Sequence, residues 1–190
     1  MQRFIETSRL VLRRFTMGDA DNLVELDGDP AVMRFLTGGR ATAREVIKTE
    51  TLSTWLGYYE RFAALGYWAA QEKLTGDFVG WFSLRPVVGD SSIEAELGYR
   101  LRRLAWGKGY ATEVSRALLR SAFAESNVER VFATTMAVNT ASRRVMEKIG
   151  LRFIRTFHQS WPDPIEGSEL GDVEYALTLA EWKQRIEPHV

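Results

Sequence analysis

A pair of glycines separated by one residue is the part of this sequence most suited to chemistry. Gly107 and Gly109 stand in the stretch 106–113, WGKGYATE, between a strand-like run and a long amphipathic helical pattern. Glycine allows a tight turn and the close approach of another molecule, while the start of a helix offers unpaired backbone N–H groups with a partial positive charge. This combination is typical of a site for a phosphate or a pyrophosphate.

Two common phosphate-binding motifs do not fit this loop. A P-loop has a glycine where Arg102 stands and a serine or threonine where Gly109 stands. A dinucleotide fingerprint needs its third glycine at the position of Thr112, which disfavours an NAD-dependent enzyme. The spacing alone leaves two interpretations open: a phosphate cradle, or glycines that only shape a turn from strand to helix.

The composition predicts one soluble globular domain over residues 1–190, with 45% hydrophobic and 26% charged residues. The 25 basic and 25 acidic residues cancel, so we expect neither nucleic acid nor an anionic membrane surface as a partner. The N-terminal residues contain no signal-peptide core, and no apolar run is long enough to span a bilayer. A cytoplasmic protein is therefore expected.

Cysteine is absent, which excludes disulfides, thiolate metal sites and a cysteine nucleophile. The two histidines, His158 and His189, have no carboxylates at metal-ligand spacing. The sequence therefore predicts no metal site.

Periodicity along the chain predicts alternating strands and helices. Strand-like patterns cover residues 9–15, 67–71, 77–84, 93–101, 130–138, 151–159 and 172–179. Helical patterns cover residues 19–27, 30–38, 42–65 with a break at Gly57, 107–126, 140–149 and a short C-terminal segment. This order predicts an α/β (α+β) fold in which one mixed sheet carries helices on both faces.

Three motifs in this order resemble the GNAT acyl-CoA N-acyltransferase superfamily, most closely its ribosomal-protein N-terminal acetyltransferase branch. They are ELGYRL at 96–101, WGKGYATE at 106–113 and NTASRRVMEKIGLRF at 139–153. The opening TSRLVLR at 7–13 resembles the first strand of the same branch. The resemblance implies a GNAT-like fold with a mostly antiparallel sheet, and it extends over nearly the whole chain.

The resemblance also implies acetyl-CoA as a co-substrate. In the family's phosphate loop, Gln/Arg-x-x-Gly-x-Gly/Ala, Gly109 and Ala111 fill the last two places while Trp106 takes the first. Backbone N–H groups from 107 to 112 would hold the pyrophosphate, and main-chain groups of 99–101 would pair with pantetheine like an added strand. The coenzyme-binding residues implied are Tyr99, Arg100, Leu101, Trp106, Gly107, Lys108, Gly109, Tyr110, Ala111, Thr112, Asn139, Ser142 and Arg143.

Several of these side chains also have simpler interpretations. Lys108 either adds positive charge at the loop or is only solvated. Asn139 either binds pantetheine or caps the helix that follows it. Arg143 is implied to meet the adenosine phosphate. A solvated charged rim is an alternative to phosphate contact for Arg100, Arg102 and Arg103.

Acetyl transfer to an amine calls for a base and for a proton at the departing sulfur. The resemblance implies Glu96 as the base, with Glu94 on the same face of the strand. The alternative for Glu96 is to orient the substrate amine or to pair with an arginine. Many relatives have a proton-donating tyrosine where Met146 stands. Here either Ser142 donates or relays a proton to sulfur, as we expect, or the thiolate leaves with solvent help alone.

The function implied is direct transfer of an acetyl group from acetyl-CoA to a primary amine in a ternary complex. A non-catalytic acyl-CoA-sensing module of the same fold is the alternative. Trp81 and the loop 161–171, with its carboxylates Asp163, Glu166 and Glu169, are expected to reach the amine acceptor. A peptide N-terminus or a small amine would serve as the acceptor, and the protein would be a monomer or a homodimer.

Overall fold

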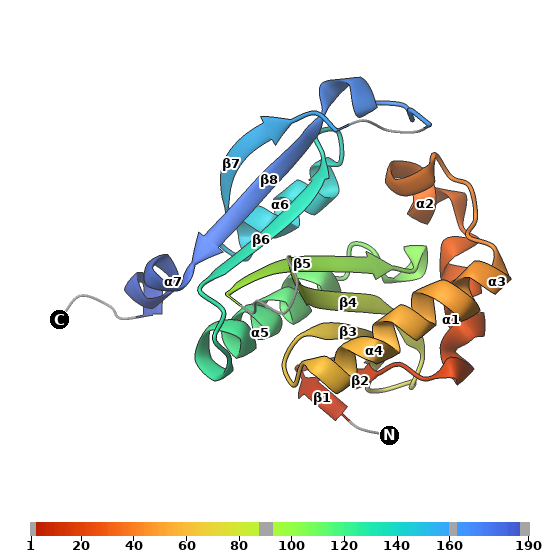
Figure 1. Cartoon of the computed structure of the whole chain (residues 1–190), viewed down its shortest axis with the longest axis horizontal. Coiled ribbons are helices and arrows are strands. Elements are labelled where there is room, and N and C mark those ends of the chain that lie inside the picture. Colours follow the sequence, from red (N-terminus) through yellow and green to blue (C-terminus); the bar gives the residue numbers. More distant parts are fainter. Residues whose placement is uncertain (1–2, 88–92, 160–162, 187–190) are drawn as a thin grey trace.

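One eight-stranded sheet runs through the molecule in the order β1-β2-β3-β4-β5-β6-β8-β7 (Figure 1). The computed structural model describes residues 3–87, 93–159 and 163–186. Neighbouring strands are antiparallel except β5 and β6, so the predicted mixed, mostly antiparallel sheet is confirmed. The strands are β1 (Arg3–Glu6), β2 (Leu10–Arg14), β3 (Gly66–Glu72), β4 (Phe78–Pro86), β5 (Glu94–Leu101), β6 (Arg130–Met136), β7 (Arg152–Phe157) and β8 (Asp172–Thr178).

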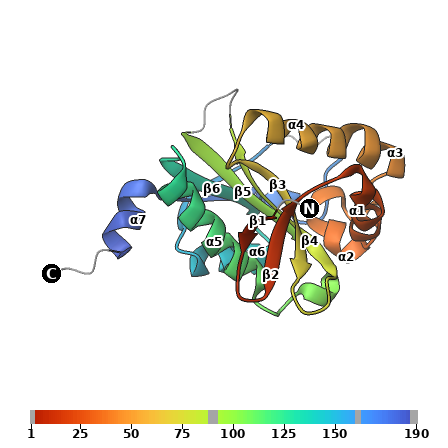
Figure 2. The same cartoon turned by 90° about the horizontal axis from the view of Figure 1, so that it is seen from below.

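Helices cover both faces of this sheet, with α4 on one side and α5 and α6 on the other (Figure 2). The α-helices are α1 (Ala20–Asp27), α2 (Pro30–Thr37), α3 (Arg44–Val46), α4 (Ser53–Arg61), α5 (Tyr110–Glu125), α6 (Thr140–Lys148) and α7 (Leu179–Ile186). Shorter 3-10 turns are η1 (Met17–Asp19), η3 (Arg103–Ala105) and η4 (Ser168–Leu170), and η2 (Ile47–Leu52) is π-helical.

The main core fills the space between the sheet and α5. Val114 and Leu118, one helical turn apart, are completely buried against strand residues such as Leu97 and Phe82. Each such side chain contributes about 1.5–3 kcal/mol by leaving water. This packing fixes α5, and with it the glycine loop at its N-terminus, against the end of β5.

The segment predicted as one helix over 42–65 with a break at Gly57 differs in the structure. Gly57 lies inside α4, and the irregularity comes earlier, where η2 widens the helix between α3 and α4. The helix also ends at Arg61, where Phe62 turns to an extended conformation. Apolar spacing alone does not distinguish a π turn from an α turn, because both keep the same face toward the sheet.

Strand β1 was not predicted, and it pairs with β2 at the sheet edge. It spans only four residues and its register shifts between Arg3 and Ile5, so it offers little alternation to detect. Its Phe4 stacks on Trp68 with ring centroids 4.2 Å apart, which adds the strand to the core.

Asp19 stands at the N-cap position of α1, but its carboxylate makes no capping hydrogen bond. It pairs with Arg13 of β2 at 2.6 Å, and both side chains are only 5% exposed. Burial alone would raise the pKa of Asp19, but hydrogen bonds from Arg13 and from the Thr16 N–H outweigh it and lower that pKa. The pair anchors the start of α1 to the sheet.

Candidate active site

Strands β5 and β6 part after a short parallel contact (Figure 1). Glu94, Ala95 and Glu96 pair with β6, whereas β6 from Ala133 onward pairs only with β8. Beyond Glu96, β5 stays paired with β4 alone, which leaves main-chain groups facing the gap without a strand partner. Such an exposed strand edge can accept an extended ligand by main-chain hydrogen bonding.

The glycine loop lies at the far end of β5 and opens α5. Gly107 and Gly109 have φ angles of 73° and 81°, the left-handed conformation that glycine adopts without strain. Within the described residues, no acceptor is found for the backbone N–H groups from 107 to 112. The first bond of the helix is donated by the Glu113 N–H to the Gly109 carbonyl at 3.0 Å. The loop therefore presents a row of free donors at a helix N-terminus.

Trp106 ties the glycine loop to the end of β5, because its indole N–H donates to the Leu101 carbonyl at 2.9 Å. This bond uses one of the two acceptor sites of that carbonyl, so the main-chain role expected for Leu101 stays a prediction. Only the backbone of Tyr110 is open to a ligand in the loop, since its ring is buried and its phenol donates to Glu72. Lys108 is exposed, with its ammonium 5.9 Å from the centre of the Tyr110 ring.

Arg9, which sequence reasoning missed, holds the glycine loop from the side. Its guanidinium donates to the Lys108 carbonyl at 2.8 Å and lies 4.6 Å from the centre of the Tyr110 ring. It comes from the turn between β1 and β2, and no short motif signals a contact with a loop one hundred residues later. A hollow of about 600 Å³ opens beside it, lined by Thr7, Ser8, Arg9, Gly109, Thr112, Glu113, Arg116, Arg120 and Lys148.

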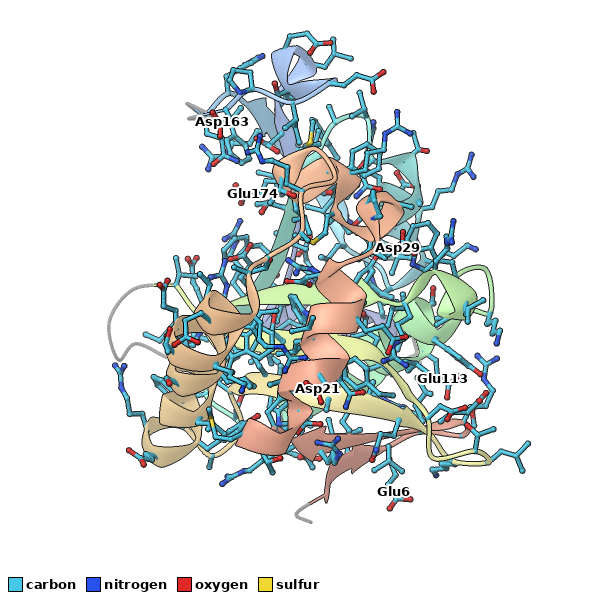
Figure 3. The ribbon with its side chains drawn as sticks, turned by 90° about the vertical axis from the view of Figure 1, so that its right-hand side faces the viewer. Glu6, Asp21, Asp29, Glu113, Asp163 and Glu174 are labelled. Carbon is cyan, nitrogen blue, oxygen red and sulfur yellow. The ribbon has the colours of Figure 1, made fainter. Side chains whose placement is uncertain are left out.

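Glu113 is the acidic residue of this hollow and sits in the first turn of α5. Burial alone would raise its pKa, but hydrogen bonds from Thr7, the Arg9 main chain and side chain, and Ser8 lower the pKa of Glu113 to about 2. Figure 3 shows Glu113 at the edge of the molecule opposite α4. The remaining charged groups around the hollow are cationic, which suits a phosphate ligand.

Two arginines suggested at phosphates have other partners in the structure, and their contact with a phosphate stays a prediction. Arg100 points to the other face of β5, where it pairs with Asp27 of α1. Arg143 donates to the Tyr175 phenol at 3.2 Å and to the Ala137 carbonyl at 3.0 Å. Alternation along the strand places the Arg100 side chain on the face toward Asp27. Arg143 lies on α6, close enough to β8 for its guanidinium to reach Tyr175.

Asn139 and Ser142 form the N-terminal cap of α6. The Ser142 N–H donates to the Asn139 side-chain oxygen at 3.2 Å, and the Asn139 amide donates to the Thr135 hydroxyl at 3.0 Å. The capping interpretation of Asn139 is therefore confirmed, while contact with pantetheine stays a prediction. Met146 is buried in the core and offers no proton.

A tyrosine hydroxyl does lie beside Ser142, but it comes from β5 and not from α6. The Tyr99 phenol lies 3.4 Å from the Ser142 hydroxyl, within hydrogen-bond range, and its ring packs on Phe82. Burial raises the pKa of Tyr99, only partly offset by the bond to Ser142, so the phenol keeps its proton. Sequence reasoning assigned Tyr99 by its main chain and missed its side chain.

Glu96 lies where the two strands part. Its carboxylate pairs with Arg85 of β4 and accepts a hydrogen bond from the Thr134 hydroxyl of β6 at 3.1 Å. The arginine pairing that the sequence left open is therefore present. Each carboxylate oxygen has two acceptor sites, so room remains for one more donor at each.

Residues 163–166, which lie between β7 and β8, contact α2 and the segment that follows it. Arg40 pairs with Asp163 at 2.9 Å and Arg34 with Glu166 at 3.3 Å, so these carboxylates are partly neutralised. Figure 3 shows Asp163 at the top of this view. Trp161, expected near the acceptor, lies outside the described residues.

The acetyltransferase (GNAT) domain family matches residues 9–152. The chain belongs to the GNAT acetyltransferase family. It is 32% identical over 205 residues to the FsC-acetyl coenzyme A-N(2)-transacetylase of Aspergillus fumigatus, covering 98% of this chain and 81% of the relative. It is 30% identical over 179 residues to the uncharacterized N-acetyltransferase YnaD of Bacillus subtilis, covering 94% and 98%. This GNAT protein is accordingly an acetyl-CoA-dependent acyltransferase.

Solved structures share the fold. A GNAT-family acetyltransferase from Bacillus anthracis superposes with a TM-score of 0.74 at 27% identity, covering 94% of this chain and 99% of that one. RimL, a ribosomal L7/L12 alpha-N-protein acetyltransferase in complex with coenzyme A, gives a TM-score of 0.78 at 16% identity, covering 95% and 99%. At that identity the likeness to RimL is one of fold alone.

The site of this GNAT domain fits coenzyme A. The space above Gly107 is open, because an added Cβ would meet nothing within 4 Å. The free N–H groups of the glycine loop would hold the pyrophosphate, and the unpaired edge of β5 would hold the pantetheine amides. In the described ranges, no group of three or more His, Cys, Asp or Glu side chains is arranged to hold a metal ion, and no helix is long and apolar enough to cross a membrane.

Proposed function

We propose that this GNAT enzyme transfers the acetyl group of acetyl-CoA directly to a primary amine while both substrates are bound. The observation that carries the proposal is the gap between β5 and β6, which is bordered by candidate groups for each proton transfer. Glu96 bridges the two strands at the start of the gap, and Tyr99 meets Ser142 across it. The name of the Aspergillus fumigatus relative, an N(2)-transacetylase, supports nitrogen as the acceptor atom.

Glu96 is proposed to take a proton from the acceptor ammonium, directly or through a water, and to pass it to solvent. The neutral nitrogen then forms a bond to the acetyl carbon while the carbon–sulfur bond breaks, and the extra proton left on that nitrogen passes to solvent or to the departing sulfur. Sulfur leaves with the electron pair, and the Ser142 hydroxyl donates a hydrogen bond to it. Because thiols ionise far more readily than alcohols, a thiolate departs with this modest help.

Direct transfer is distinguished from an acyl-enzyme route by initial-rate kinetics. Thiol release from acetyl-CoA is measured with peptides bearing free N-termini, lysine and polyamines as acceptors, over a grid of both substrate concentrations. Intersecting double-reciprocal lines are expected, since both substrates bind before transfer. Parallel lines would show a covalent intermediate and overturn the ternary complex. Acetyl-CoA binding with no thiol release for any acceptor would favour the acyl-CoA-sensing alternative.

The proposed setting is the cytoplasm, and the proposed assembly is a monomer or homodimer. The second statement rests on the completeness of the candidate site within one chain. Each candidate group named for transfer, from Glu96 to Ser142, comes from the same sheet and its helices. Cell fractionation and light scattering would test the two statements.

A further inference from the structure

Arg9 joins the glycine loop to the first turn of α5, although it lies 99 positions before Lys108 in the chain. Its Nε and Nη2 atoms face the same carboxylate oxygen of Glu113 at 2.7 and 2.6 Å. Its Nη1 atom donates to the Lys108 carbonyl at 2.8 Å. One side chain serves both partners at once because the guanidinium presents its N–H donors as a rigid, planar fork.

The Arg9 residue is itself held by its surroundings. Its guanidinium carbon lies 4.6 Å from the centre of the Tyr110 ring, and its main-chain N–H donates to the second Glu113 oxygen at 3.0 Å. Its carbonyl accepts a hydrogen bond from the Lys73 N–H, in the turn between β3 and β4, at 2.9 Å. The side chain is 46% exposed, yet these contacts order it before any ligand binds.

The bond from Arg9 to the Lys108 carbonyl sets the direction of the next N–H group. The peptide unit between Lys108 and Gly109 is trans, so its C=O and N–H point to opposite sides. The Gly109 N–H therefore points away from the Arg9 guanidinium. Within the described residues this N–H has no acceptor, so it is one of the free donors at the start of α5.

The glycine loop needs such a restraint because its own residues provide little. Glycine adopts many backbone conformations, and Gly109 follows the Lys108 carbonyl directly, so this peptide unit can rotate at low cost. A Cβ added to Gly107 would meet nothing within 4 Å, which shows that no packing holds that side of the loop. The Arg9 bond supplies the restraint that the glycines lack.

Arg9 also offsets a charge that opposes the binding of an anion. Glu113 lies in the first turn of α5, beside the free N–H donors, and with a pKa of about 2 it is a carboxylate at neutral pH. A carboxylate and a phosphate at one helix start repel each other. The ion pair with Arg9 neutralises the carboxylate, so the donors of the loop remain favourable to a phosphate.

We propose that Arg9 is a positioning residue for coenzyme A, which aims the Gly109 N–H at the pyrophosphate and neutralises Glu113 beside it. The inference rests on the proposed function in one respect, the binding of acetyl-CoA at the glycine loop. Arg9 acts through the Lys108–Gly109 peptide unit. Its replacement should therefore weaken the binding of the phosphate-bearing part of the coenzyme and leave the pantetheine part unaffected.

Calorimetric titration with coenzyme A tests the proposal without an acceptor amine. Arg9→Lys keeps a positive charge near Glu113 but lacks the fork that reaches the Lys108 carbonyl at the same time. We expect it to weaken binding roughly fivefold to tenfold. Arg14→Lys is the matched control, since Arg14 of β2 lies 4.8 Å from the centre of the Tyr59 ring on α4, and it should bind like wild type. Wild-type affinity in Arg9→Lys would show that charge is sufficient and would overturn the positioning role.

S-acetylpantetheine, which lacks the pyrophosphate and the adenosine, separates positioning from general damage to the fold. With acetyl-CoA, Arg9→Lys should raise KM by the factor seen in binding and leave kcat unchanged. With S-acetylpantetheine, both parameters should match those of wild type. Equal losses with both donors would mean a merely structural role and contradict the proposal. If no amine is acetylated with either donor, the proposed function fails, while calorimetry still judges Arg9.

If Arg9→Lys does not fold, NMR of the wild-type protein decides the question. The Arg9 Nε–H should exchange slowly with water before any ligand is added, because it is already bonded to Glu113. Saturation with coenzyme A should shift the Gly109 amide signal, whereas pantetheine, the probe without phosphates, should leave it in place. Rapid exchange at Arg9, or a Gly109 signal that coenzyme A does not move, overturns the proposal.

Discussion

At the residue scale, Glu96 joins three strands through one carboxylate. Its pair with Arg85 belongs to β4, and its bond from the Thr134 hydroxyl belongs to β6. These contacts keep the side chain at the point where the strands part. A base there would be oriented before the acceptor arrives.

We expect Glu96→Gln to lower kcat/KM by roughly 100-fold at neutral pH and by less at high pH. The reason is that the acceptor amine loses its proton unaided as the pH rises. Glu94→Gln is the matched control, because Glu94 is two residues earlier, more exposed and paired with Arg130 at 3.4 Å. A pH–rate profile measures both variants. If Glu96→Gln lost stability but kept the wild-type profile, its role would be structural.

The hydroxyl pair Tyr99–Ser142 predicts a non-additive result. Tyr99→Phe should lower kcat roughly threefold to tenfold with little change in KM, because the phenol orients the Ser142 hydroxyl toward sulfur. Ser142→Ala should lower kcat at least as far, and the double variant should lose no more than Ser142→Ala alone. Single-turnover kinetics provide the measurement. Losses that multiply would show that the two hydroxyls act independently.

At the element scale, the turn into α5 requires a left-handed residue at Gly109, where φ is 81°. Gly109→Ala should raise the KM for acetyl-CoA roughly tenfold, because alanine in this conformation costs about 1–2 kcal/mol and shifts the N–H groups of the loop. Gly57→Ala is the control. Gly57 is within α4 with open space around its added Cβ, so alanine should stabilise by about 0.5–1 kcal/mol. An unchanged KM for Gly109→Ala would remove the loop from the coenzyme site.

The first turn of α5 also predicts a pH dependence of stability. The pKa of Glu113 is lowered to about 2 in the folded state, below its ordinary 4.5. A lowered pKa means that the stabilisation is complete above the ordinary value and is lost as the pH falls from about 5 toward 2. Glu113→Gln should therefore destabilise by roughly 1–2 kcal/mol at pH 7, a value discounted for the half-exposed Arg9.

Urea unfolding over a pH series measures this difference. The difference in the free energy of unfolding between wild type and Glu113→Gln should shrink as the pH approaches 2, because the carboxyl of the wild type then takes up a proton. A constant difference across the series would mean that the hydrogen bonds, and not the charge, carry the effect.

At the scale of the whole molecule, the sheet is two halves that meet at β5 and β6. The half with β1 to β5 carries the glycine loop and Glu96, whereas the half with β6 to β8 carries Asn139 and Ser142 through α6 (Figure 1). The site exists only where the halves diverge. The ion pairs of Arg34 in α2 and of Arg40 after it with Glu166 and Asp163 are exposed and contribute little to stability.

Acetyl-CoA should protect the free edge of β5 from hydrogen exchange. Amides within 97–101 that face the gap have no partner on β6, so added main-chain hydrogen bonds would slow their exchange. Amides of β7, which pairs with β8 at the far edge of the sheet, serve as the internal reference. Unchanged exchange at saturating acetyl-CoA would contradict strand-like binding.

Most strands, helices and helix ends could be predicted from the sequence because they depend on residues close together in the chain. Apolar periodicity marked most strands and helices, and Gly38 and Gly150 marked helix ends. The glycine loop and the order of its flanking motifs pointed to the GNAT family, which the domain match confirms. The π turn and the four-residue β1 escaped because neither changes the apolar pattern.

The sequence by itself determined the order of all strands but β1 and the fold family, and it predicted a main-chain coenzyme site, since these depend on neighbours within one turn or strand. Only the tertiary structure decided the side-chain partners. It brought Arg9 to the glycine loop, turned Arg100 to the opposite face toward Asp27, and set Tyr99 beside Ser142. Those contacts join residues 43 to 99 positions apart, and sheet register, not local pattern, determines which side chains meet.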